Sequence, residues 1–175
     1  MEAPGSDGSL LEALFRITRP EGELLAALRA LNIDPDQLAA KYTSRQWVQA
    51  LELYRRHLFS SLDVAEGNRK LGHALAMGFT QTISGTLLLA TLPLFSPQRL
   101  LRNWPRLVRM GRTDVELDVT ETGPRSADIH SKDPVDVPAA LNLGMLEFAF
   151  ERLGVRARFE VELLGPGEVV MHCSW

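Results

Sequence analysis

The sequence has few of the residues and patterns that would point to a particular chemistry. It contains one cysteine, Cys173, so an internal disulfide is impossible and no cysteine pair is spaced for zinc. A lone thiol indicates a reducing compartment, and we expect a cytoplasmic protein. The most apolar run, 87–95, is interrupted by Pro93 and is far shorter than the roughly 20 residues that cross a membrane. We therefore expect no transmembrane segment.

Signatures of catalysis and cofactor binding are also missing. None of the histidines is spaced from another like a pair of metal ligands; they are His57, His73, His130 and His172. The glycines between residues 72 and 85 lie inside a helical pattern, not in the strand-to-helix turn that binds phosphate. The net charge of -3 opposes nucleic-acid binding, which needs a concentrated basic surface. We expect no enzyme, metal, cofactor or nucleic-acid partner.

In the first two thirds of the chain, apolar residues recur every three or four positions, the period of amphipathic helices. The longest such stretch runs from Asp63 to about Ala90 and contains several glycines. A glycine inside a helix costs about 1 kcal/mol relative to alanine. We therefore expect either that another backbone packs closely against these glycines or that the helix breaks between Thr80 and Gly85. The start of the chain is rich in Gly, Pro and Ser, which predicts a disordered leader over residues 1–9.

The last third of the chain changes to a period of two, which indicates half-buried strands. Pairs of such strands lie on each side of one helix that Asp136 caps and Gly154 ends. The helix is apolar on two sides, so we expect it to lie between the sheet and either other helices or a second subunit. The sequence predicts one α+β domain over residues 10–175. Its helical part, 10–110, packs on a small antiparallel sheet of a ββαββ part, 111–175.

Apolar side chains from both parts of the chain are candidates for lining a ligand pocket. Such pockets are mostly apolar with a few polar groups. We expect this one between the long helix and the sheet with its helix. The candidate residues are Leu75, Phe79, Ile83, Met145, Phe148 and Phe159. The alternative is that these side chains simply fill the core.

A run of arginines lies on the helix expected to begin at Pro97. Their spacings of three, four and three residues place them on one face; they are Arg99, Arg102, Arg106 and Arg109, the arginine stripe. Burial of several unpaired guanidinium groups costs far more than it returns. We therefore expect the arginine stripe to be exposed or paired with carboxylates such as Glu116, Glu160 or Glu162. A solvated helix face is the simpler interpretation, and a surface for an acidic partner or an anionic headgroup is the sharper one.

The C-terminal part resembles a known group of domains. The segments Asn142–Met145, Leu153–Gly154, Val155–Val161 and Val170–Trp175 are similar to the C-terminal half of four-vinyl-reductase-type ligand-binding domains. That fold is shared with nitric-oxide-sensing haem domains and with vesicle-tethering (TRAPP-type) subunits, so the resemblance implies a sensory or scaffolding role. The metal-binding cysteines of some four-vinyl-reductase-type members are missing except Cys173, and the proximal-histidine motif of the haem sensors has no clear counterpart. The resemblance therefore implies neither a metal site nor haem.

Nearly the whole chain resembles a large paralogous family of myxobacterial proteins of unknown function. The similar pieces, in order, are Leu14-Phe15-Arg16, Leu31-Asn32-Ile33-Asp34, Tyr42 with Trp47, Leu71-Gly72, Gly78-Phe79 with Thr82, Thr86-Leu87, Pro97 with Arg99 and Leu101, Arg109 with Arg112, Gly144 and Trp175. Each piece is short, but their combination in this order is fairly specific. The resemblance implies the fold and transfers no catalytic residue.

Two functions follow as hypotheses. The first is a non-enzymatic sensor or signalling module that binds a small apolar molecule in the pocket. The alternative is a protein-interaction or scaffold module that acts through dimerisation, either as a homodimer or with another protein. The two-sided helix and the glycine-bearing long helix are both suited to self-association.

Overall fold

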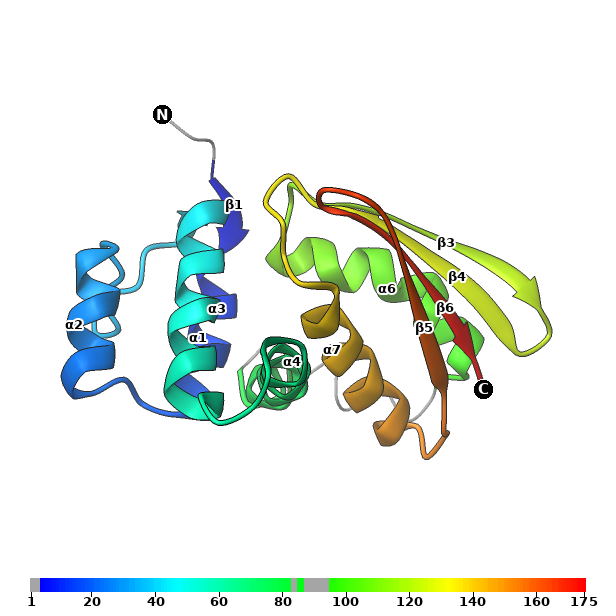
Figure 1. Cartoon of the computed structure of the whole chain (residues 1–175), viewed down its shortest axis with the longest axis horizontal. Helices are drawn as coiled ribbons and strands as arrows, with labels where there is room; N and C mark the ends of the chain where they lie inside the picture. Colours follow the sequence, from blue (N-terminus) through cyan, green and yellow to red (C-terminus); the bar gives the residue numbers. More distant parts are fainter. Residues whose placement is uncertain (1–3, 83–84, 87–94) are drawn as a thin grey trace.

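A helical half and a strand-rich half make up the protein (Figure 1). The computed structural model describes residues 4–82, 85–86 and 95–175. The helical half contains β1 (Pro4–Asp7), α1 (Gly8–Ile17), α2 (Gly22–Ala30), β2 (Lys41–Thr43), α3 (Ser44–Phe59), α4 (Val64–Phe79) and α6 (Pro97–Gly111). The strand-rich half contains β3 (Glu116–Gly123), β4 (Ser126–Lys132), α7 (Ala139–Arg152), β5 (Arg158–Gly165) and β6 (Glu168–Ser174). This arrangement confirms the predicted α+β class and its ββαββ order.

The main sheet is antiparallel, with the spatial order β3-β4-β6-β5. The two hairpins predicted from the alternating pattern pair with each other through β4 and β6, where Ile129 lies opposite Met171. One face of the sheet is buried against α6 and α7 (Figure 1), and Ile129, Met171 and Cys173 on that face are at most 2% exposed. The other face carries polar side chains, because alternate residues of a strand point in opposite directions.

Two hydrophobic cores meet at α7. The first lies among α1, α2, α3 and α4 and includes Leu14, Tyr54 and Leu71; the second lies between α6, α7 and the sheet and includes Leu100. Met145 of α7 packs against both cores. The prediction that this helix lies between the sheet and another element is confirmed, and α4 is that element. The helix surfaces that suggested self-association are therefore used within the chain.

The close contact of α4 with α7 explains two of the glycines. A Cβ atom at Gly72 would overlap the backbone carbonyl of Leu141, and one at Gly144 would overlap the carbonyl of Arg69. Because each backbone fills the space that a side chain would need, both helices depend on glycine here. The helix also ends early, since α4 stops at Phe79. Residues 83–84 and 87–90 of the predicted longer helix lie outside the described residues.

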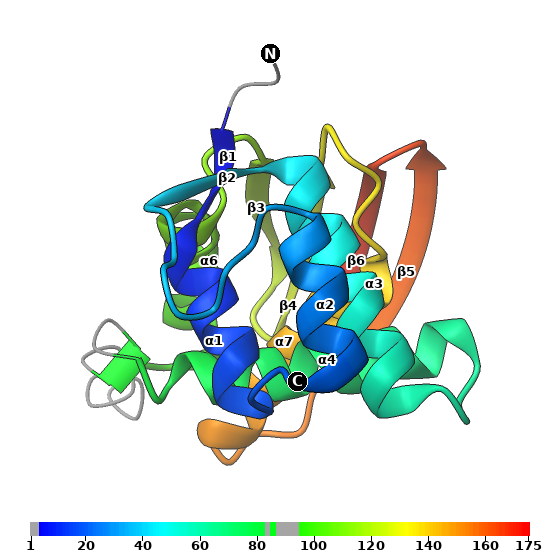
Figure 2. The same cartoon turned by 90° about the vertical axis from the view of Figure 1, so that its left-hand side faces the viewer.

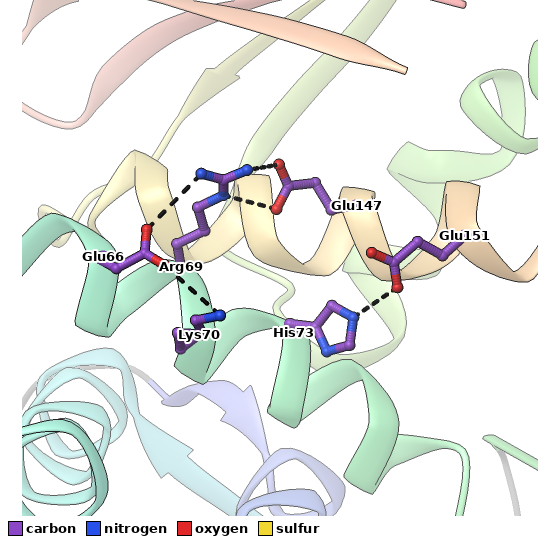
Figure 3. A network of polar contacts seen from close by, with 6 residues as sticks. All are labelled: Glu66, Arg69, Lys70, His73, Glu147 and Glu151. Atoms are coloured by element: carbon purple, nitrogen blue, oxygen red, sulfur yellow. Dashed lines mark hydrogen bonds and ion pairs between the residues drawn. The ribbon is translucent and has the colours of Figure 1, made fainter. Parts of the chain in front are cut away.

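Ion pairs join the same two helices on their solvent side (Figure 3). Nε of Arg69 donates to Oε2 of Glu147 over 2.8 Å, and Nε2 of His73 lies 2.8 Å from Oε2 of Glu151. The partners are four residues apart on each helix, so the two pairs lie one turn from each other. Pairs this exposed contribute about 0–1 kcal/mol each. These pairs match the register of the two helices, whereas the glycine contact sets the distance between them.

The predicted disordered leader over residues 1–9 is wrong for residues 4–9. Pro4–Asp7 forms β1, which pairs with β2, and α1 begins at Gly8 with the Asp7 side chain accepting from Ser9 N. Ser6 is 1% exposed and bridges to Arg112. Backbone pairing with distant segments orders this stretch, and composition alone does not reveal such pairing. Residues 1–3 lie outside the described residues.

Among the described helices, none combines the length and the apolar character that crossing a membrane requires.

We predict that Gly144→Ala destabilises the protein by about 3 kcal/mol, because the added methyl group forces the two backbones apart. Helix propensity alone would stabilise this variant by about 1 kcal/mol, so the two effects differ in sign. The free energy of unfolding in urea measures the change. Gly165→Ala is the matched control, since nothing lies within 4 Å of a Cβ atom there. A neutral or stabilised Gly144→Ala protein would contradict the close helix contact.

Candidate functional site

A cavity of about 150 Å³ lies where the two cores meet, between α4, α6, α7 and the sheet. Its lining is mostly apolar and draws on segments from both halves of the chain. The apolar lining residues are Leu10, Trp47, Leu75, Ala76, Phe79, Leu100, Trp104, Leu107, Val108, Gly111, Val115, Leu117, Val137, Leu141, Met145, Phe148 and Ala149. Thr80, Arg112, Ser131, Asp133 and Asn142 are the polar ones.

The structure brings four of the six predicted pocket residues around this cavity. They are Leu75 and Phe79 of α4 and Met145 and Phe148 of α7. Phe159 does not line it: its ring packs edge-on against Phe150 in the sheet-side core, with centroids 5.6 Å apart. Ile83 lies outside the described residues.

The contribution of α6 to the cavity was missed by the sequence reasoning. Trp104, Leu107 and Val108 line the cavity from this helix. The arginine stripe could have indicated this contribution, because a helix with one strongly charged face presents its other face to an apolar environment. Trp104 is buried, with 8% of its surface exposed.

A buried ion cluster forms the polar wall of the cavity. Nε of Arg112 donates to Oδ1 of Asp114 over 2.8 Å, and its Nη2 donates to Oδ1 of Asp133, also over 2.8 Å. The side chains of Arg112 and Asp133 are 7% and 8% exposed. The hydroxyl of Ser44 donates a further hydrogen bond to Asp114. One cation thus serves two carboxylates at the boundary between β1, the end of α6 and the loop after β4.

The pKa values of the two carboxyl groups shift in opposite directions. Burial raises the pKa of Asp114, but hydrogen bonds from Arg112 and Ser44 together outweigh it and leave the pKa below its usual value. Burial also raises the pKa of Asp133, and the Arg112 hydrogen bond offsets this only in part. Asp114 is therefore the carboxylate that Arg112 holds firmly in the charged form.

All four members of the arginine stripe are exposed. Arg102 pairs with Glu121 of β3, a partner that the sequence did not suggest, with Nε 2.5 Å from Oε1. The guanidinium of Arg99 lies 4.9 Å from the ring centroid of Phe95, and Nε of Arg109 donates to the carbonyl of Pro105. The stripe is thus a solvated helix face on the side of α6 opposite the cavity.

The histidines and the cysteine lie away from the cavity. His73, His130 and His172 each lie within 2.9 Å of a carboxylate on the surface, and His57 is exposed. Cys173 is buried in the sheet-side core, where burial raises the pKa of its thiol to about 12. In the described part of the chain, no three His, Cys, Asp or Glu side chains are grouped as a metal site would need.

The chain belongs to the family described as "Protein of unknown function (DUF2378)", which its residues 6–175 match. This confirms the expectation of a family of unknown function. No curated protein matches the chain. The resemblance to four-vinyl-reductase-type domains and tethering subunits stays a prediction.

Several solved structures share the fold, and they are H-NOX proteins. The Fe(II) unliganded H-NOX protein from K. algicida has a TM-score of 0.64 at 16% identity, covering 96% of this chain and 95% of that one. The S. oneidensis H-NOX protein in the Fe(II)NO ligation state has a TM-score of 0.68 at 8% identity, covering 96% and 98%. An oxygen-binding H-NOX domain related to soluble guanylate cyclases has a TM-score of 0.61 at 10% identity, covering 95% and 89%. Identities this low establish the fold alone.

The described residues do not fit a haem, the group named for another structure with this fold, one with a TM-score of 0.70 at 9% identity. Iron in haem is held by a His, Cys, Tyr or Met side chain. Among the lining residues only Met145 is of these types, and no histidine is among them. The chemistry of the lining therefore opposes haem.

We predict that Arg112→Met lowers the free energy of unfolding by about 3–5 kcal/mol near pH 7, because the buried carboxylate of Asp133 and the half-buried carboxylate of Asp114 lose their cation. Burial raises the pKa of Asp133 even beside Arg112, so without that cation this carboxyl binds a proton more readily in the folded variant than in the unfolded chain. The stability of the variant then rises as the pH falls through this raised pKa. In the wild type the pKa of Asp114 is lowered, so its contribution to the free energy of unfolding is lost as the pH falls.

The difference in stability should therefore shrink when urea unfolding is repeated at about pH 5. Arg106→Met, on the exposed face of α6, is the control and should change the free energy of unfolding by less than about 0.5 kcal/mol. A loss at Arg112 that is independent of pH would contradict the ion cluster.

The double variant Arg102→Ala with Arg106→Ala should remain folded, because the Arg102–Glu121 pair that it removes is exposed to solvent. Circular dichroism and thermal unfolding check this. If the double variant is already unfolded at room temperature, the arginine stripe is part of a structural network.

Proposed function

We propose that this member of the DUF2378 family is a non-enzymatic sensor module that binds a small apolar molecule between its two cores. The observation that carries the proposal is the cavity of about 150 Å³, whose lining is mostly apolar and comes from α4, α6, α7 and the sheet. Well-packed proteins have few voids larger than a water molecule. A cavity of this size at the junction of two cores is therefore a feature that needs a reason, and a ligand supplies one.

The volume and the lining limit the class of ligand. Apolar cavities of about 150 Å³ stay dry and take up benzene or xenon. A diatomic gas without a metal gains at most about 3 kcal/mol from its two atoms, which corresponds to a Kd weaker than about 1 mM. A molecule with a single ring or a short hydrocarbon chain has enough atoms for useful affinity. We therefore favour a small aromatic or aliphatic compound over a free gas.

Helix α6 offers a way to transmit occupancy of the cavity. Its Leu100 and Trp104 line the cavity, while the arginine stripe faces solvent on the other side of the same helix. A ligand that displaces Trp104 shifts α6 and with it the stripe. The polar wall supports binding more than catalysis, because the donors of Arg112 are already engaged by Asp114 and Asp133.

We predict that single-ring aromatic compounds raise the melting temperature. At about ten times its Kd a ligand adds about 1.4 kcal/mol, which corresponds to a rise of about 3–6 °C for a domain of this size. Ala149→Leu places three more carbon atoms at the cavity wall and should abolish the rise. Ala26→Leu, at an exposed position of α2, is the matched control and should keep it.

Haemin is titrated into the same proteins as a separate arm. The proposal expects no stoichiometric haem absorption band and no rise in melting temperature with haemin. Tight binding of haemin, or a ring-compound response that Ala149→Leu leaves intact, would overturn the proposal.

A further inference from the structure

Strand β5 leaves an apolar part of the sheet uncovered. It is an edge strand, paired only with β6, and Figure 2 shows it at the outer margin of the molecule. Val161 and Leu163 are 40% and 73% exposed, whereas their neighbours on β6, Met171 and Val169, are 1% and 8% exposed. The inner face of the sheet is therefore buried as far as β6 and open at β5. An edge strand of this kind is a template for pairing with another chain.

Most charged side chains on β5 and just before it have no ion-pair partner. Arg156, Arg158 and Glu160 form no ion pair within residues 4–82, 85–86 and 95–175. Glu162 is the exception, because its Oε2 lies 3.4 Å from Nε2 of His172. Two arginines are followed by two glutamates at a spacing of two, with Phe159 at the midpoint. In the segment 155–163, positive charges therefore lie before Phe159 and negative charges lie at the same distances after it.

We propose that β5 pairs with β5 of a second copy of this chain, antiparallel and centred on Phe159, in a two-fold dimer. In this register Arg158 lies opposite Glu160 of the second copy. Arg156, in the segment 155–157 that leads into β5, lies opposite Glu162 of that copy when the pairing extends into this segment. On the other face Val161 lies opposite Ala157, and residues 155 and 163 lie opposite each other. Directly opposite residues share one face of an antiparallel sheet. On one face every charged residue therefore meets a residue of opposite charge, and on the other face every apolar residue meets an apolar one.

Neighbouring registers lose this complementarity. A pairing centred on Arg158 or on Glu160 places that residue opposite its own copy, which juxtaposes like charges. A pairing centred on Val161 places Glu160 opposite Glu162 of the second copy, again with like charges. Like charges directly opposite each other destabilise a sheet. The charges therefore select Phe159 as the centre, and this register also covers the exposed Val161 and Leu163 with apolar side chains of the second copy.

The dimer closes by symmetry and continues the sheet from one copy into the other. A two-fold interface uses the same patch on both copies and leaves no further β5 edge for a third. The edge of β5 is then protected as edges in natural sheets are. This assembly involves neither the cavity nor the arginine stripe, so it stands apart from ligand binding.

Charge-reversal variants test the register. Arg158→Glu places glutamate opposite Glu160 at two equivalent positions, and Glu160→Arg places arginine opposite Arg158. Each variant alone should weaken dimerisation by at least about tenfold, measured by sedimentation equilibrium. An equimolar mixture of the two variants should form a heterodimer with a Kd close to that of the wild type, because every pair is again of opposite sign. Arg106→Glu is the charge-matched control on α6 and should dimerise like the wild type.

Recovery in the mixture separates a pairing defect from misfolding, since a misfolded variant cannot regain affinity through an equally altered partner. A wild-type chain that stays monomeric at high micromolar concentration would overturn the proposal. So would a dimer that both single variants leave unchanged, or variants whose mixture fails to associate.

Discussion

The contact between the backbones of α4 and α7 is the constraint on which the rest of the structure depends. Gly72 and Gly144 allow each helix to touch a carbonyl of the other, which a methyl group at either position would prevent. This contact ties the helical half to the strand-rich half, because α4 belongs to the first core and α7 to both. The cavity lies beside it, where helices held at a fixed distance leave room that Leu75 and Met145 do not fill.

The protein shares the fold of H-NOX structures but not the chemistry of a haem pocket. The fold is set by the order of helices and strands and by the helix contact, which do not require a particular cavity lining. The lining is set by side chains such as Trp104, Phe148 and Met145, which reduce the space to about 150 Å³ and supply no histidine. A fold can therefore be retained while the ligand class changes, since function resides in the site and not in the architecture.

The sequence predicted the parts of this structure that have a local signal. The change of hydrophobic period located the ββαββ order, and helical spacing selected Leu75, Phe79, Met145 and Phe148, which line the cavity. It could not reveal the ion cluster, because Arg112 meets Asp133 across 21 positions and Ser44 meets Asp114 across 70. It also misplaced Phe159, since alternation assigns a residue to a face of the sheet but not to a position along it.

A crystal structure determined under xenon pressure tests the central claim most directly. Xenon occupies dry apolar cavities and scatters strongly enough to be located without a model of its surroundings. We expect a xenon atom between α4, α6 and α7, in contact with Leu75, Trp104 and Met145, with the surrounding backbone unchanged. A site that stays empty under pressure, with side chains of α6 collapsed against α4 and α7, would contradict the existence of a ligand cavity between the two cores.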